Sequence, residues 1–507
     1  MIAKTFSAAL NGIEANLVDI EAYMSGGNPN LVIIGLPDTA VKESKDRVIT
    51  AIKNSGFDYP FAKRFVVNLA PADLKKEGAA FDLPIALSIL AILGYIQPKK
   101  LKEFCAAGEL ALDGKIKKIR GSLPIALSAR KNGINKIIVS AKNAQEASVI
   151  NDVEIFPFEN LSQAAMFING DLYQEPHVYD ASKDNSEYAS KIDFADIKGQ
   201  FIAKRAAEVA AAGGHNLIMS GPPGSGKTML AKRMPTILPQ MTFEESIETT
   251  KIWSAAGQNF SGNLIRIRPF RSPHHTSSTV SLAGGGIYPK PGEVSLAHNG
   301  ILFLDEFSEF RRDALEILRQ PLEDNKITVS RIKNALTFPA SFMLIAAMNP
   351  CPCGNFGNPN KECVCSFIQI RRYLSKISGP LLDRIDIHIS MPAVNIEELT
   401  DWARNGEASK TIRDRVIAAR EIQTERFKET KIFSNSQMNA QEIKKFCAID
   451  QKTSQMLKEI AVKLKLSARA FDRVLKVSRT IADLDKSENI KASHISEAAQ
   501  YRAAEIL

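Results

Sequence analysis

One segment of the chain combines glycines, a lysine and a hydroxyl group at the spacing that binds a chain of phosphates. It consists of Gly221, Pro222, Pro223, Gly224, Ser225, Gly226, Lys227 and Thr228. This G-x-x-x-x-G-K-[ST] pattern follows an apolar run, Leu217–Ser220, and precedes a helical stretch, which is the context that the pattern requires. Glycines let backbone N–H groups turn inward around an anion, and the helix N-terminus adds positive charge. We expect Lys227 to reach the β- and γ-phosphates of ATP and Thr228 to bind Mg²⁺.

A second segment, GILFLDEF at residues 300–307, supplies two adjacent acids. Its four apolar residues predict a buried strand that ends at Asp305 and Glu306. We expect Asp305 to take part in Mg²⁺ coordination, directly or through water, and Glu306 to polarise the attacking water as general base. Either acid alone could instead be an acidic helix cap.

Two further polar residues follow apolar segments. Asn349 comes directly after the predicted strand at 342–347, where its amide could orient the attacking water. Arg384 interrupts the mostly apolar GPLLDRIDI and would suit an arginine finger that acts in a neighbouring subunit's site. The alternative for Arg384 is a surface salt bridge with Asp383 or Asp386.

Four cysteines form two close pairs, Cys351 with Cys353 and Cys363 with Cys365. Four thiols at this spacing, in a reducing compartment, suit a tetrahedral structural Zn²⁺ site. The alternative is a redox-labile surface loop.

The surrounding pattern predicts an α/β protein with several domains. We expect an α+β N-terminal domain at 1–172, a polar linker at 173–193, an α/β ATPase domain at 194–394 and a helical lid at 395–507. In the first domain, apolar runs predict strands at 31–34, 65–69 and 136–140.

Composition limits the classes of protein that remain. The 507 residues are 45% hydrophobic and 24% charged, with no apolar run of membrane-spanning length and no signal-peptide pattern at the N-terminus. We therefore expect a cytoplasmic protein that does not contact a membrane. The formal net charge of +9 weakly favours a polyanionic partner such as nucleic acid.

The order of motifs GPPGSGKT, LFLDEF, AAMNP and PLLDRID resembles the magnesium-chelatase-like branch of the AAA+ ATPases. The segments GLPDTAVKESKDRV and PFRSPHHTSS are similar to those of the ComM/YifB family within that branch. The resemblance implies an AAA+ P-loop domain with a helical lid, and a hexameric DNA helicase that promotes branch migration during natural transformation. It also implies that Arg384 acts on a neighbouring subunit and that Arg469 is a sensor arginine of the lid, with Arg473 as the alternative.

Two inserts would contact single-stranded or branched DNA in the channel of such a ring. The first, at 264–295, lies where this branch carries a pore-facing helix insert, and the second, at 326–338, predicts a β-hairpin. For the adjacent histidines of the first insert, His274 and His275, a structural or DNA-contact role is favoured over metal binding. The basic residues that we expect to contact DNA are Arg266, Arg268, Arg271 and Lys333.

The N-terminal domain resembles the proteolytic domain of Lon proteases, which use a serine activated by a lysine. The stretch where the serine would lie reads Ala79, Ala80 and Phe81, and the lysine region reads RGSLPIA, so we expect this domain to be proteolytically inactive. The function that competes with a DNA motor is a magnesium-chelatase-type ATPase that remodels a protein partner.

Overall fold

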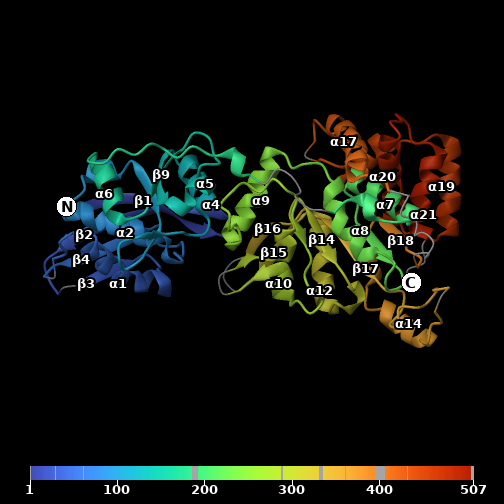
Figure 1. Ribbon diagram of the computed structural model, residues 1–507, viewed down its shortest axis with the longest axis horizontal. Helices are drawn as coiled ribbons and strands as arrows, with labels where there is room; N and C mark the ends of the chain where they lie inside the picture. Colours follow the sequence, from blue (N-terminus) through green and yellow to red (C-terminus); the bar gives the residue numbers. More distant parts are fainter. Residues whose placement is uncertain are drawn as a thin grey trace. The chain divides into compact units, whose positions relative to one another are not determined.

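The computed structural model describes residues 2–28, 30–60, 62–184, 192–286, 289–330, 335–359, 361–393, 406–430 and 432–503. The chain forms two compact units, which are coloured along the sequence in Figure 1. Unit 1 comprises residues 1–185 and 243–266, and unit 2 comprises residues 186–242 and 267–507. The segment 243–266 therefore packs with the N-terminal part of the chain, although it lies inside the range expected for the ATPase domain.

Unit 1 is built on a seven-stranded mixed sheet with the order β3-β4-β2-β1-β5-β8-β9. The three strands expected from the sequence are present, and a long antiparallel pair, β1 with β2, lies at the centre. The bounds are β1 Ile2–Asn11, β2 Glu14–Ser25, β3 Asn30–Ile34, β4 Arg64–Ala70, β5 Phe104–Ala107, β8 Lys136–Ser140 and β9 Glu154–Phe158, with a small hairpin of β6 Glu109–Leu110 and β7 Ile116–Lys117.

Helices cover both faces of this sheet because alternate strand residues point to opposite sides. Ala106 and Ile138 pack in one apolar cluster with α2, whereas Cys105 and Ile137 pack in another with α4. Every residue of α2 is buried, which explains its continuous apolar sequence. The helices are α1 Thr39–Asn54, α2 Asp82–Ile92, α3 Pro98–Leu101, α4 Ser122–Lys131, α5 Ala144–Ala147, α6 Leu161–Asn169 and α9 Phe243–Ala256.

Unit 2 contains a five-stranded sheet with the order β11-β14-β17-β10-β18, in which all pairs are parallel. The strands of this sheet are short and almost entirely buried, as expected when helices cover both faces. Their bounds are β10 Leu217–Ser220, β11 Phe270–Arg271, β14 Ile301–Leu304, β17 Met343–Met348 and β18 Ile387–Ser390.

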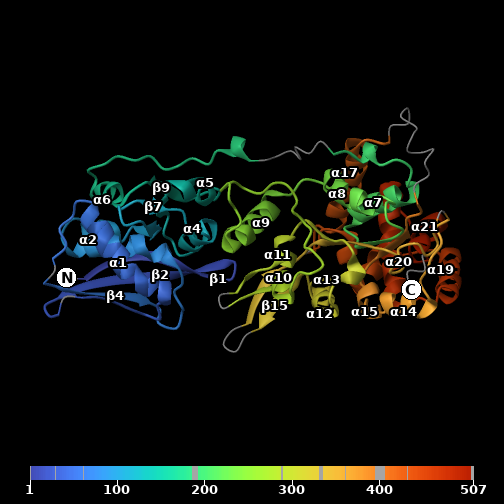
Figure 2. The ribbon, with the colours of Figure 1, turned by 60° about the horizontal axis from the view of Figure 1, so that its bottom comes forward.

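The helices of the ATPase part of unit 2 are α7 Phe201–Gly213, α8 Lys227–Arg233, α10 Thr279–Ala283, α11 Glu293–Leu296, α12 Arg312–Glu316, α13 Pro321–Asp324, α14 Phe367–Leu374 and α15 Gly379–Leu382. Both inserts contain short strands. β12 Gly284–Gly285 pairs with β13 Lys290–Pro291, and β15 Lys326–Ser330 pairs with β16 Ala335–Pro339. The second pair confirms the predicted hairpin and is visible near α10 and α11 in Figure 2.

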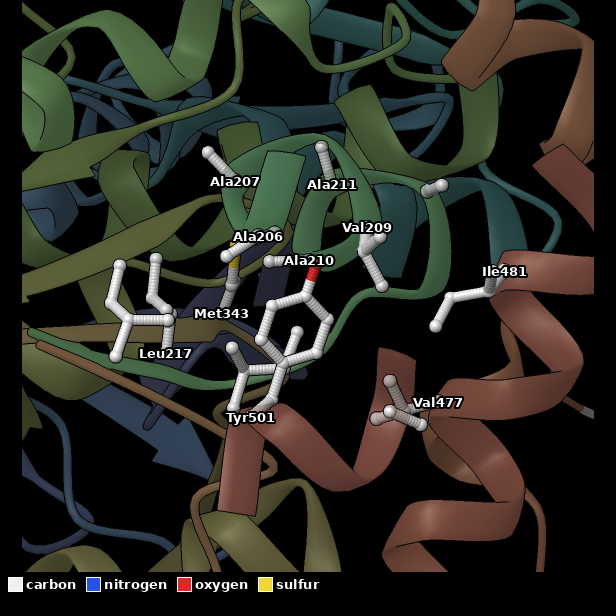
Figure 3. Packing of buried hydrophobic residues seen from close by; sticks show 14 of the residues in the cluster. Ala206, Ala207, Val209, Ala210, Ala211, Leu217, Met343, Val477, Ile481 and Tyr501 are labelled. Atoms are coloured by element: carbon white, nitrogen blue, oxygen red, sulfur yellow. The ribbon is translucent and has the colours of Figure 1, made fainter. Parts of the chain in front are cut away.

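After residue 405 the described chain is helical and contains no strand. These helices are α17 Ser409–Arg426, α18 Ala440–Phe446, α19 Gln451–Lys463, α20 Ala468–Leu484 and α21 Ala492–Ala503. They share one apolar core with the ATPase part, because the alanines of α7 let other elements approach closely. In Figure 3, Ala210 of α7 lies near Tyr501 of α21, with Val477 and Ile481 of α20 in the same cluster.

None of the described helices is long and apolar enough to cross a membrane.

Candidate functional site: a nucleotide site at the sheet edge

The predicted ATP-site residues meet at one edge of the parallel sheet. Strand β17 lies between β10 and β14, and all three run in the same direction. Gly221 follows β10, Asp305 follows β14 and Asn349 follows β17, so the three residues lie side by side at the carboxyl ends of the strands. This edge is where open α/β sheets bind ligands.

The phosphate loop, Gly221–Thr228, has the backbone geometry that its glycines predict. Gly224 and Gly226 have φ values of 79° and 93°, which other residues adopt only with strain. At Gly221, a Cβ atom would lie 2.3 Å from the carbonyl oxygen of Met391, so no larger residue fits. Helix α8 begins at Lys227, directly after the loop, and the N–H groups of its first turn face the same region. The loop therefore fits a phosphate chain.

The Lys227 ammonium lies inside this loop. It donates hydrogen bonds to the carbonyl oxygens of Gly221 at 2.6 Å and Pro222 at 2.9 Å, and to Asn349 Oδ1 at 3.4 Å. Burial lowers the pKa of Lys227 to about 8, and the charge of Asp305 opposes this shift. The structure thus brings the predicted phosphate-binding lysine and the predicted water-orienting asparagine together.

The two predicted magnesium ligands are also in contact. The Thr228 hydroxyl donates a 2.7 Å hydrogen bond to Asp305 Oδ2. A hydroxyl and a carboxylate are hard oxygen ligands of the type that Mg²⁺ takes in nucleotide sites, so the pair fits this ion.

Glu306, the predicted base, has a φ of 51° in the left-handed region and a half-exposed side chain. Its carboxylate contacts the imidazole of His275, with 2.8 Å between Glu306 Oε2 and His275 Nδ1. Apart from the two adjacent histidines, no pattern in the sequence indicates this contact.

Arg384 lies at the opposite edge of the same sheet. Its carbonyl oxygen accepts a 3.3 Å hydrogen bond from Asn216 Nδ2, and Asn216 precedes β10. Its guanidinium is buried and forms an ion pair with Glu323, and it donates a 2.8 Å hydrogen bond to the carbonyl oxygen of Pro380. The sequence-based alternative of a salt bridge with Asp383 or Asp386 named the wrong acid, because Glu323 is distant in sequence and close only in the fold.

The two lid arginines lie on this same side of the sheet. Arg469 is mostly exposed and lies 3.7 Å from Glu323 Oε1, so Glu323 contacts both Arg384 and Arg469. Arg473 forms an ion pair with the buried Asp386, which also accepts a 2.9 Å hydrogen bond from the backbone N–H of Asn216. Burial alone would raise the pKa of Asp386, but Arg473, His215 and Lys476 together outweigh burial and hold that pKa well below its usual range.

The four predicted zinc ligands form a cluster of thiols. Cys351 Sγ lies 3.4 Å from Cys353 Sγ and 3.6 Å from Cys363 Sγ, and all four ligand sulfurs, including that of Cys365, lie within 4.8 Å of one another. Zinc with Zn–S bonds of about 2.3 Å and tetrahedral geometry requires sulfur separations of about 3.8 Å. The cluster fits such an ion, whereas the separations are far longer than the roughly 2 Å of a disulfide.

The arginines predicted to contact DNA engage groups of their own chain. Arg266 pairs with Asp184 in unit 1 at 2.7 Å, and Arg271 forms two hydrogen bonds of 2.6 and 2.7 Å with the carboxylate of Glu293. Arg268 donates to the backbone carbonyl oxygens of Pro239, Gln240 and Asn299. Lys333 lies outside the described residues. Contact of these four residues with DNA stays a prediction.

In unit 1, the stretch compared with the Lon serine, Ala79–Phe81, forms a short turn before α2. In the stretch compared with the Lon lysine, Ser122 and Leu123 are buried in the first turn of α4.

The sequence is similar to known proteins along almost its whole length. Family models match residues 20–143 (Subunit ChlI of Mg-chelatase), 193–399 (Magnesium chelatase, subunit ChlI) and 406–502 (Magnesium chelatase, subunit ChlI C-terminal). The chain is 44% identical over 505 residues to Competence protein ComM of Haemophilus influenzae, which covers 99% of this chain and 97% of that protein. It is 42% identical over 507 residues to the uncharacterized protein YifB of Salmonella typhimurium. This match covers 100% of this chain and 98% of that protein. A weaker similarity, 28% over 251 residues, relates it to Lon protease 2 of Bacillus subtilis, covering 44% of each chain.

Proposed function

Because this chain belongs to the ComM/YifB family of magnesium-chelatase-like AAA+ proteins, we propose that it is an ATP-driven DNA motor that works as a ring. The observation that carries the proposal is the placement of its charged groups on the parallel sheet. The phosphate loop and Asp305 lie at one edge, and Arg384 lies at the other.

At the first edge, the chain's own residues supply most of the parts that phosphoryl transfer needs. The phosphate loop and Lys227 bind and orient the phosphates, and Asn349 positions the attacking water beside them. Glu306 takes the proton from that water as the water oxygen bonds to the γ-phosphorus. The bond between the γ-phosphorus and the β–γ bridging oxygen breaks, and ADP leaves with that oxygen. Thr228 and Asp305 would hold Mg²⁺, which would neutralise charge that develops on the phosphate oxygens.

At the second edge, the arginines serve a different nucleotide. The first and last residues of β10 are roughly 10 Å apart. The phosphate loop follows the last of these residues, whereas Arg384 lies beyond the first, just before β18. An arginine finger at this position complements the phosphate site of an adjacent copy, where it stabilises the charge of the transition state. Glu323 contacts both Arg384 and Arg469, so the two cations would be presented to the adjacent copy together. Such sharing of sites favours a closed ring of identical subunits, for which we propose a hexamer.

The polyanion that we propose for this motor is single-stranded or branched DNA. The name of the Haemophilus relative connects that protein with competence. We extend this to a role in natural transformation, in which the motor promotes branch migration of DNA during homologous recombination. The net charge of +9 supports contacts with the phosphate backbone, as do the basic residues Arg331 and Lys333, which come between β15 and β16 in the sequence.

We further propose that the cluster of Cys351, Cys353, Cys363 and Cys365 holds a structural Zn²⁺ ion. The cluster begins two residues after Asn349, so an ion there would fix the chain as it leaves the ATP site. Gly354 in this loop also packs closely against Pro223 of the phosphate loop.

The test is ATP turnover with and without a forked DNA over a series of salt concentrations. We expect stimulation by DNA that weakens as salt rises, because the contacts are to phosphates. A matched duplex without a branch reports whether the fork is preferred. ATP turnover that does not respond to any DNA would contradict the proposed DNA-motor function, but it would not contradict the ATPase activity.

The second candidate function is remodelling of a protein partner by a magnesium-chelatase-type ATPase. It is favoured by the three ChlI family models that match residues 20–143, 193–399 and 406–502. Turnover that is indifferent to DNA but stimulated by a protein would support it.

A further inference from the structure

The adjacent histidines of the first insert have different partners. The rings of His274 and His275 lie against each other, with centroids 4.1 Å apart. His274 Nδ1 lies 2.9 Å from the Thr276 hydroxyl in its own loop. His275 Nδ1 instead lies 2.8 Å from Glu306 Oε2, and the ring of His275 stands edge-on to the buried Phe310 at 6.5 Å. Only one of the two histidines therefore reaches the ATP site.

The sheet explains why His275 reaches Glu306. Strand β11 pairs in parallel with β14, with Phe270 opposite Ile301. His275 comes four residues after the end of β11 and Glu306 two residues after the end of β14, so both lie at the edge that carries the phosphate loop. Phe310, which directly follows the short turn Phe307–Glu309, supports the imidazole from the side.

The carboxylate of Glu306 needs such support. Its side chain is half exposed, and the local hydrogen bonds of Glu306 involve its backbone and not its carboxylate. The Glu306 N–H donates to Asp305 Oδ1 at 3.0 Å, and its carbonyl oxygen accepts from the Glu309 N–H at 2.7 Å. An exposed carboxylate that rotates freely is a poor general base, because proton abstraction requires one oxygen at a defined place near the water. A donor on Oε2 fixes the carboxylate and leaves Oε1 to accept the proton.

We propose that His275 is a positioning residue for Glu306, which it holds in the orientation needed to activate water. This inference rests on the proposed ATPase function and adds to it a residue from the insert. Because His275 belongs to the segment that we expect to face DNA, the contact also gives DNA binding a direct route to the base.

Substitution of His275 tests the proposal, because the contact uses Nδ1. The amide nitrogen of asparagine can occupy nearly the same place as Nδ1, whereas that of glutamine reaches further. We expect His275→Ala to lower kcat for ATP by on the order of tenfold to a hundredfold with little change in KM. His275→Asn should recover most of this loss and His275→Gln should not. Lys428→Ala, which removes an exposed side chain paired with Glu425 on the lid, is the control and should keep the original kcat.

Glu306→Gln, measured in parallel, distinguishes the role of His275 from the role of Glu306 as general base. If Glu306→Gln is stalled while His275→Ala turns over normally, the role of His275 is refuted and the base assignment stands. If Glu306→Gln still hydrolyses ATP, the proposed base is wrong and His275 loses its target. A double variant that is slower than Glu306→Gln alone would also contradict the proposal, because His275 should act only through Glu306. Equal recovery of kcat in His275→Gln and His275→Asn would contradict a contact made through Nδ1.

Discussion

Asn216 donates a 3.3 Å hydrogen bond from its side chain to the carbonyl oxygen of Arg384, which fixes Arg384 at the amino end of β10. The phosphate loop begins at the carboxyl end of that same strand. The predicted arginine finger is thereby separated from its own nucleotide by the length of the sheet.

This separation predicts complementation between two defective variants. Arg384→Ala should lower turnover by on the order of a thousandfold with nucleotide binding retained, as for other arginine fingers. Glu306→Gln should also be stalled. In a mixture, a site with an intact Glu306 can receive Arg384 from a Glu306→Gln neighbour, so turnover should rise above the sum of the two. Arg311→Ala, which removes an exposed arginine paired with Asp313, is the control. Mixed rings with no gain would argue against action between subunits.

Within the phosphate site, two substitutions should have different effects. Lys227→Ala removes the ammonium from the loop and should abolish measurable ATP binding, whereas Glu306→Gln should bind ATP and fail to hydrolyse it. Binding of a fluorescent ATP analogue and release of phosphate measure the two steps separately. Normal phosphate release by Glu306→Gln would be inconsistent with its role as base.

The cysteine cluster predicts a zinc content of about one ion per chain, the number that four thiolates bind in one tetrahedral site. Cys353→Ser and Cys363→Ser should each lower the zinc measured by elemental analysis, and should lower the melting temperature of the chain. Cys105→Ala, a change in the core of unit 1, should retain the metal. Protein prepared with zinc in the medium and found free of it would rule out the zinc site.

A buried acid in unit 1 predicts a pH dependence of stability. Burial is the largest cause that raises the pKa of Asp82 to about 6, and its ion pair with Arg47 opposes that rise. Between the unfolded pKa of about 4 and the folded value, the folded state binds more protons than the unfolded state. The free energy of unfolding should therefore fall as pH rises from about 4 to about 6, by up to about 3 kcal/mol from this group.

Urea unfolding of the full chain and of Asp82→Asn across this pH range measures the effect. The variant cannot titrate at this position, so the difference in stability between the two proteins should change with pH. Two parallel curves would show that Asp82 keeps an ordinary pKa.

Local patterns were enough to predict much of unit 2. The phosphate loop, the strand before Asp305 and Glu306, the strand before Asn349 and the β15–β16 hairpin all lie where the sequence indicated. Each is a short segment whose conformation follows from its own glycines, apolar runs or alternation. In unit 1 the same patterns predicted β3, β4 and β8 but did not reveal the long β1–β2 pair, whose mixed residues become a strand mainly through pairing.

The sequence by itself determined which residues could bind phosphate, magnesium and zinc, because these properties depend on residue type and close spacing. Only the tertiary structure decided which acids the basic residues meet. The pairs Arg384–Glu323, Arg473–Asp386 and His275–Glu306 join residues that are far apart in the sequence. Ion pairs have no sequence period, so their partners are set by the order of strands in the sheet and by the packing of the lid on α7.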